Sequence, residues 1–168
     1  MHGNASLEKV TFNCLRIRCS LKKDDIPVYT GQSRGLTRPS VNSAGVSGDF
    51  GLDMATLLPE LAEEDRPSGS DAVLAMAHEI LRHEKETVVL IGIGPMTNIA
   101  LLLRRFPKVR EWLRRIVIMG GARFYGNVSR FSEFNIWVFF ISSHTTLTSR
   151  AIRRLHRNYS RFQKLQKK

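Results

Sequence analysis

The sequence predicts an α/β fold with a mainly parallel, open sheet flanked by helices. Two apolar runs rich in branched residues, at 87–93 and 115–119, have the composition of strands inside such a sheet. Between and before them lie segments whose apolar residues recur at helical spacing. Helices that alternate with apolar strands are typical of parallel sheets, because each parallel pair needs a crossover connection.

The first part of the chain predicts one helix, one strand and a long loop. Apolar residues recur at three- and four-residue steps over residues 6–21, and Asn4 or Ser6 is placed to cap this helix. Residues 26–30 read as a short strand. Residues 31–70 are rich in Gly, Ser, Pro and acids, so we expect a loop with one short helix.

The second part predicts the sheet itself. A helix over residues 71–81, with Asp71 as N-cap, leads to a strand at 87–93 that we expect to be buried on both faces. A helix at 98–105 and a short helix near 108–114 then connect this strand to the strand at 115–119.

Glycine-bearing segments follow both strands, at residues 92–97 and 120–127. Ligands of open parallel sheets bind beyond the carboxyl ends of the strands, so these segments are where we expect a site. Neither segment has the glycine spacing of a dinucleotide or P-loop fingerprint.

Charge divides the chain into two parts. The net charge is +11, from 26 Lys and Arg against 15 Asp and Glu, and residues 139–168 hold eight of these bases and no acid. We therefore predict a domain over residues 1–138 and a basic tail over 139–168 that is helical in part. Such a tail is able to bind an anionic membrane, calmodulin or nucleic-acid phosphate, or it has no function.

Other composition features exclude whole classes of protein. Two cysteines are too few for a disulfide framework and lack the spacing of a zinc site. No apolar run is long enough for a membrane span, and the start of the chain lacks the features of a secretory signal. We expect a soluble, cytoplasmic protein.

Polar residues gather after the second strand, where Asn127, Glu133 and Asn135 follow Met119. One interpretation is a loop whose amides cap turns. The other is that amide and carboxylate groups hydrogen-bond a polyhydroxylated ligand such as a sugar. The spacing of these residues leaves both interpretations open.

Motifs along the chain resemble the inosine-uridine preferring nucleoside hydrolase family. The matching segments, in family order, are His2–Asn4, Leu7–Asn13, Asp25–Tyr29, Gly94–Ala100, Met119–Gly121, Gly126–Asn127 and Glu133–Ile136. The resemblance covers residues 2–138. It implies the family's α/β fold and an activity that hydrolyses the N-glycosidic bond of ribonucleosides, with a bound calcium ion, in nucleoside catabolism and purine salvage.

The resemblance also implies roles for particular residues. Asn127, Glu133 and Asn135 match residues that hold the ribose hydroxyls, Met119 matches a residue lining the sugar pocket, and Asn4 matches an asparagine near the ribose. The main-chain carbonyl of Ile93 falls where the family has a calcium ligand. No residue of this sequence is matched to a catalytic group, and the side-chain ligands of the metal stay unknown.

Two family motifs have no match in these 168 residues. One is the Asp-x-Asp-x-x-x-Asp-Asp cluster that ends the family's first strand, and the other is a late His-Asp pair. We therefore expect a truncated form that lacks the first strand and the C-terminal half. For the chain alone we expect little or no activity and no retained calcium.

An alternative function is a non-catalytic ribose-binding or interaction protein. It would act through its basic tail or by pairing with a full-length relative, and homo-oligomers are a further expectation because unpaired sheet edges favour association. The sequence does not decide between purine and pyrimidine nucleosides.

Overall fold

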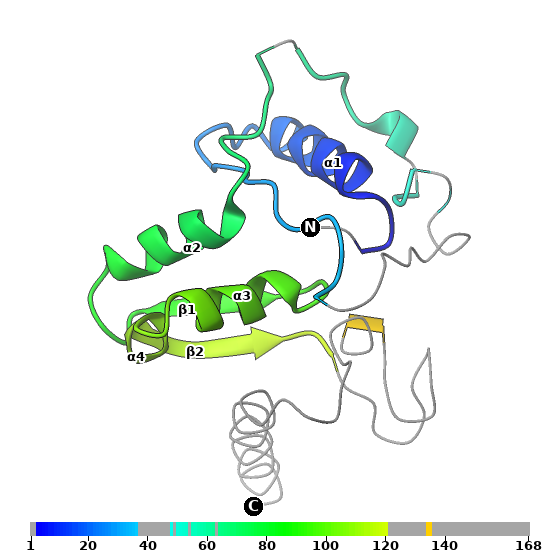
Figure 1. Ribbon diagram of the computed structural model, residues 1–168. Coiled ribbons are helices and arrows are strands. Elements are labelled where there is room, and N and C mark those ends of the chain that lie inside the picture. The colour runs from blue at the N-terminus through cyan, green and yellow to red at the C-terminus, as the bar shows by residue number, and fades with distance from the viewer. Residues whose placement is uncertain are drawn as a thin grey trace, which may run out of the picture.

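The computed structural model describes residues 3–36, 48, 50–53, 55–62, 64–120 and 134–135. Figure 1 shows the elements in chain order. They are α1 (Leu7–Ser20), the 3₁₀ turn η1 (Ala55–Leu57), α2 (Ala72–Leu81), β1 (Val88–Gly92), α3 (Thr97–Arg105), α4 (Val109–Trp112) and β2 (Leu113–Ile118). The four helices predicted between residues 6 and 114, the short helix expected within 31–70 and the two apolar strands are confirmed, with end shifts of a few residues.

Strands β1 and β2 form a parallel pair, as the sequence predicts. Ile91 lies opposite Val117 and Gly92 opposite Ile118, after a shift in register between Val88 and Val89. The crossover between the strands is made by α3 and α4 (Figure 1). Both strands therefore end at the same edge of the sheet.

Helices α2, α3 and α4 pack on one face of this sheet and form the core with it. Leu102 of α3 and Val109 of α4 are fully buried at its centre. The buried cluster consists of Val73, Ala77, Ile80, Leu102, Val109 and Leu113, with Val88, Leu90 and Ile116 of the strands packed against it. This cluster holds the two strands in the register that brings their carboxyl ends together.

The prediction that the first apolar strand is buried on both faces is wrong for the described residues. Side chains alternate between the two faces of a strand. Those that point away from the helices are exposed: Ile91 by 64% and its partner Val117 by 45%. Within the described ranges no element covers this second face, whereas the branched composition of the strand is that of a doubly covered one.

Two helices begin at residues whose side chains cap them. The Asp71 carboxylate accepts a hydrogen bond from the main-chain N–H of Leu74 at 2.9 Å. Of the two candidate caps of α1, Ser6 is the one whose hydroxyl accepts from the N–H of Lys9, at 3.4 Å. These bonds satisfy N–H groups that the first turn of a helix leaves without a partner.

The buried face of α1 differs from its apolar stripe. Ile17 and Leu21 of the stripe are exposed, whereas Asn13 and Arg16 are buried. Asn13 donates to the carbonyl of Phe50 at 2.8 Å, and Arg16 donates to two carbonyls of the 58–59 segment. The buried face of α1 therefore combines one apolar side chain, Leu15, with two side chains that donate hydrogen bonds to loop carbonyls.

The predicted strand at residues 26–30 is reduced to a single bridge. Tyr29 pairs in parallel with Gly69, and Thr30 donates its N–H to the Gly69 carbonyl at 2.9 Å. Pro27 has no N–H, and the N–H of Val28 bonds to a serine hydroxyl in place of a main-chain carbonyl. Because neither residue donates an N–H to a main-chain carbonyl, a regular hydrogen-bond ladder does not form.

Among the described residues, no helix combines the length and the apolar composition needed to cross a membrane. The expected boundary near residue 138 and the basic tail at 139–168 lie outside the described residues. The cytoplasmic location stays a prediction.

Candidate sugar site at the carboxyl ends of the strands

The carboxyl ends of β1 and β2 lie side by side and open to solvent. The N–H of Met119 donates to the carbonyl of Gly92 at 2.8 Å, so the pairing continues to the last strand residues. The next side chains are exposed, Ile93 by 70% and Met119 by 58%. The expected site edge is thus an accessible surface with main-chain groups at its base.

Asn135 joins these two strand ends. Its side-chain amide nitrogen donates to the Met119 carbonyl at 3.0 Å and to the Ile93 carbonyl at 3.4 Å. The residue is 94% buried, since its exposed fraction is 6%. In Figure 1 the orange segment at 134–135 lies beyond the end of β2. Three residues from separate parts of the sequence therefore meet at one edge of the sheet.

The beginning of the described chain lies beside the loop that follows β1. A side chain built on Gly3 would meet the ring of Pro95 at 3.5 Å, which is ordinary contact distance. Asn4 follows directly and is exposed. The structure thus brings the main chain next to Asn4 to the same β1–α3 loop that carries Ile93.

The five predicted site residues divide into two groups. Met119 and Asn135 are in direct contact, and Asn4 is in the segment that borders the adjoining loop. Asn127 and Glu133 lie outside the described residues.

Asn98 is a positioning residue that the sequence did not single out. Its side-chain oxygen accepts from the N–H of Gln32 at 3.1 Å and so fastens the loop after Tyr29 to the start of α3. Gly31 makes this approach feasible, because a Cβ there would lie 2.1 Å from the Asn98 amide nitrogen. Asn98 belongs to the 94–100 motif that resembles the family, but the motif does not indicate that Gln32 is its partner.

The groups identified at this edge are two main-chain carbonyls and one side-chain amide, and none of them is charged. Calcium takes about six to eight oxygen ligands, several of them carboxylates. The described residues contain no group of three or more His, Cys, Asp or Glu side chains that is able to hold a metal ion. The carbonyls of Ile93 and Met119 and the Asn135 amide do not by themselves fit calcium.

Among the described residues, the carboxyl groups with shifted pKa values belong to helix α2 and its cap. The N–H of Leu74, followed by the Arg105 guanidinium, lowers the pKa of Asp71. Hydrogen bonds from His83 and then Arg82 lower the pKa of Glu79. Both shifts follow from local helix and salt-bridge contacts and not from the candidate site.

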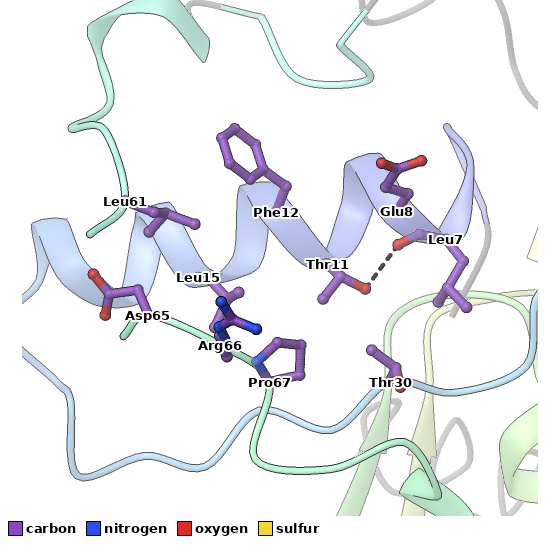
Figure 2. Close-up of a pocket in the computed structure, with 10 residues that line it drawn as sticks. All are labelled: Leu7, Glu8, Thr11, Phe12, Leu15, Thr30, Leu61, Asp65, Arg66 and Pro67. Atoms are coloured by element: carbon purple, nitrogen blue, oxygen red, sulfur yellow. Dashed lines mark hydrogen bonds between the residues drawn. The ribbon is translucent and has the colours of Figure 1, made fainter. Parts of the chain in front are cut away.

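A separate groove lies between α1 and the 61–67 segment, with a cavity volume of about 530 Å³. Figure 2 shows Leu7, Phe12, Leu15, Leu61 and Pro67 around it. Its other five lining residues are polar or charged, Glu8, Thr11, Thr30, Asp65 and Arg66. None of its lining residues belongs to β1 or β2.

The fold and the edge define an α/β protein with a candidate site beyond the carboxyl ends of parallel strands. Comparison with known protein families shows a match over residues 1–154 to the family of inosine-uridine preferring nucleoside hydrolases. The chain belongs to this nucleoside hydrolase family, as its motifs predict. The match continues past residue 138, where the resemblance by motif ends.

Individual relatives agree with this assignment. The pyrimidine-specific ribonucleoside hydrolase RihA of Klebsiella pneumoniae subsp. pneumoniae is 43% identical over 136 residues, which cover 81% of this chain and 42% of RihA. The purine-preferring ribonucleoside hydrolase of Gardnerella vaginalis superposes with a TM-score of 0.73 at 31% identity, covering 82% of this chain and 44% of that one. A plant nucleoside hydrolase, PpNRh1, shares the fold, with a TM-score of 0.71 at 24% identity over 83% of this chain and 43% of its own.

The predicted α/β fold class is therefore confirmed. The chain spans about two fifths of the length of the curated relatives that it matches.

Proposed function

We propose that this chain supplies the ribose-holding edge of a nucleoside hydrolase site, with ribonucleosides as the substrate class. The observation that carries the proposal is the contact of buried Asn135 with the carbonyls of Ile93 and Met119, at the carboxyl ends of two parallel strands. Family membership supports it, since the relatives' names identify them as ribonucleoside hydrolases.

The chemistry of this edge suits sugar hydroxyls. A main-chain carbonyl oxygen has two lone pairs. The Asn135 amide donates a hydrogen bond to one lone pair of the Ile93 carbonyl and to one of the Met119 carbonyl. The second lone pair of each carbonyl is able to accept a hydrogen bond from a hydroxyl. Exposed Ile93 and Met119 add apolar surface against which a furanose ring packs.

Saturation-transfer NMR of uridine with the purified 168-residue chain tests this assignment. We expect stronger saturation of the ribose protons than of the uracil protons, and competition by D-ribose. A Leu57→Ala variant serves as a control, because Leu57 is exposed on η1, outside the proposed edge. Saturation confined to the base, or none at saturating uridine, would contradict the assignment.

We further propose that the 168-residue polypeptide by itself turns over nucleosides negligibly and holds calcium weakly. The sequence contains no Asp-x-Asp-x-x-x-Asp-Asp cluster, and the described residues contain no group of three or more His, Cys, Asp or Glu side chains that is able to hold a metal ion. Removal of an acid–base group alone lowers a rate by roughly 10²–10⁴. Calcium is also weakly favoured where carboxylates are scarce.

Release of reducing sugar from uridine and inosine, measured with and without calcium, tests turnover. Calorimetric titration with calcium tests the metal. We expect a background rate in both conditions and no saturable heat at micromolar calcium. Calcium-dependent turnover at the rate of ordinary enzymes would refute this proposal and leave the ribose assignment intact.

A second candidate function is an interaction protein that pairs with a full-length relative or with its own copy. The observation in its favour is the exposed apolar face of the sheet, formed by Val89, Ile91 and Val117. Light scattering of the chain, alone and mixed with a full-length relative, measures pairing. We expect Ile91→Asp to abolish it, and a monomer under all conditions would count against this function. The contribution of the basic tail stays a prediction.

A further inference from the structure

We propose that Asn135 is a positioning residue, whose side-chain amide ties the carboxyl ends of β1 and β2 together through both of its N–H groups. The family resemblance places Asn135 against the sugar. The structure adds that its amide nitrogen has two main-chain partners, the carbonyls of Ile93 and Met119.

The orientation of this amide follows from the chemistry of its partners. Both partners are main-chain carbonyl oxygens, which accept hydrogen bonds and do not donate them. The NH₂ group must therefore face the two strands, because the reverse orientation would set the amide oxygen against two acceptors. An NH₂ group has two hydrogens, which is one for each of these two carbonyls.

The two hydrogen bonds of the Asn135 amide continue the hydrogen-bond ladder between β1 and β2. The main-chain bond from Met119 to Gly92 is the last one between the strands among the described residues. The bonds of Asn135 begin at the following carbonyls, those of Ile93 and Met119 itself. The side chain thus bridges the two chains where they leave the ladder, and it fixes the spacing of the carbonyls assigned to the sugar.

The consequence for substrate binding rests on the proposed function. With its N–H groups engaged at the two strand ends, Asn135 has no amide hydrogen left to donate to a sugar hydroxyl. Its main contribution is then to hold the edge in shape before the substrate arrives. This differs from a residue whose amide hydrogens become engaged only when the sugar binds.

Hydrogen exchange of the side-chain amide, followed by NMR on the 168-residue chain, tests the proposal directly. The Asn135 signals are assigned by their loss in Asn135→Asp. Without ligand, we expect both hydrogens to exchange at least about tenfold more slowly than those of the exposed Gln32 side chain. Exchange as fast as that of Gln32, or slowing only after D-ribose is added, would overturn the proposal.

Stability provides a second readout that does not depend on ligand binding. Asn135→Asp sets a carboxylate against two carbonyl oxygens, whereas Asn135→Leu only removes the donors. We expect Asn135→Asp to lower the melting temperature by at least about 5 °C and more than Asn135→Leu does. The matched control Gln32→Glu makes the same amide-to-acid change at an exposed position and should leave it nearly unchanged. Equal melting temperatures for all three variants and the unchanged chain would contradict the positioning role.

These measurements separate the two proposals. Slow exchange together with no detectable ribose binding would support the positioning role and contradict the ribose assignment. Fast exchange together with ribose binding would do the reverse.

Discussion

Leu102→Ala is the substitution that most severely tests the packing beneath the candidate site. Leu102 lies on α3 with no exposed surface and belongs to the cluster that joins three helices to the sheet. The change removes three carbons, which costs about 2.4 kcal/mol at about 0.8 kcal/mol per buried methylene. The cavity that remains adds a further cost, because the surroundings relax only in part. We expect the free energy of unfolding to fall by about 3 to 4 kcal/mol.

Urea denaturation followed by circular dichroism measures this loss. The matched control is Leu57→Ala, the same change at a side chain that is 74% exposed, and it should cost less than about 0.5 kcal/mol. If the chain is only marginally stable, Leu102→Ala will show no cooperative transition, while the control keeps one. A loss below about 1 kcal/mol for Leu102→Ala would refute the packing from which the strand-end geometry is derived.

Three further substitutions test local contacts. Gly31→Ala should lower the free energy of unfolding by about 1–3 kcal/mol, because its Cβ would lie 2.1 Å from the Asn98 amide nitrogen. In an Asn98→Ala background this loss should be smaller, and an unchanged loss would exclude the clash. For Asp71 the N–H of Leu74 lowers the folded-state pKa, so its stabilisation is present above the unfolded pKa and is lost as the pH falls through the folded one. Asp71→Asn should therefore flatten the decline in melting temperature below about pH 4, and an identical decline would count against the cap. Thr97 is buried and its hydroxyl has no hydrogen-bond partner among the described residues, so Thr97→Val should stabilise the chain by about 1 kcal/mol in urea denaturation; a clear loss would reveal a partner.

Local patterns in the sequence suffice to predict most elements of the fold. The runs at β1 and β2 are apolar and branched, and their composition alone marks them as strands. Asp71 precedes a periodic apolar segment, and its carboxylate caps α2 as that position requires. Parallel pairing follows as well, because a helical crossover between neighbouring strands demands it.

Features that depend on distant partners are not predictable in this way. The apolar stripe of α1 identifies a helix, but its buried face is set by the loop carbonyls that Asn13 and Arg16 meet. Similarly, the composition of β1 is typical of a strand that is buried on both faces, whereas the described elements cover only one face. The segment at 26–30 has strand composition, yet its pairing with residues 68–69 is confined to one bridge.

The candidate site shows the same division. Motif resemblance identified Met119 and Asn135, and the structure places them in contact. The contact of Asn135 with Ile93 joins residues far apart in the sequence, so no local pattern indicates it. The hydrogen bond between Asn98 and Gln32 is not predictable for the same reason, because an asparagine near the start of a helix gives no indication of a distant partner.

A titration of the ¹⁵N-labelled chain with D-ribose tests the central claim, that the strand ends form the sugar-holding edge, most directly. The account predicts that the largest shifts of main-chain amide signals fall on residues 93–97 and on Met119 and Gly120. Signals of the groove between α1 and the 61–67 segment should stay unchanged. Shifts concentrated in that groove, or none at the strand ends at saturating ribose, would contradict it.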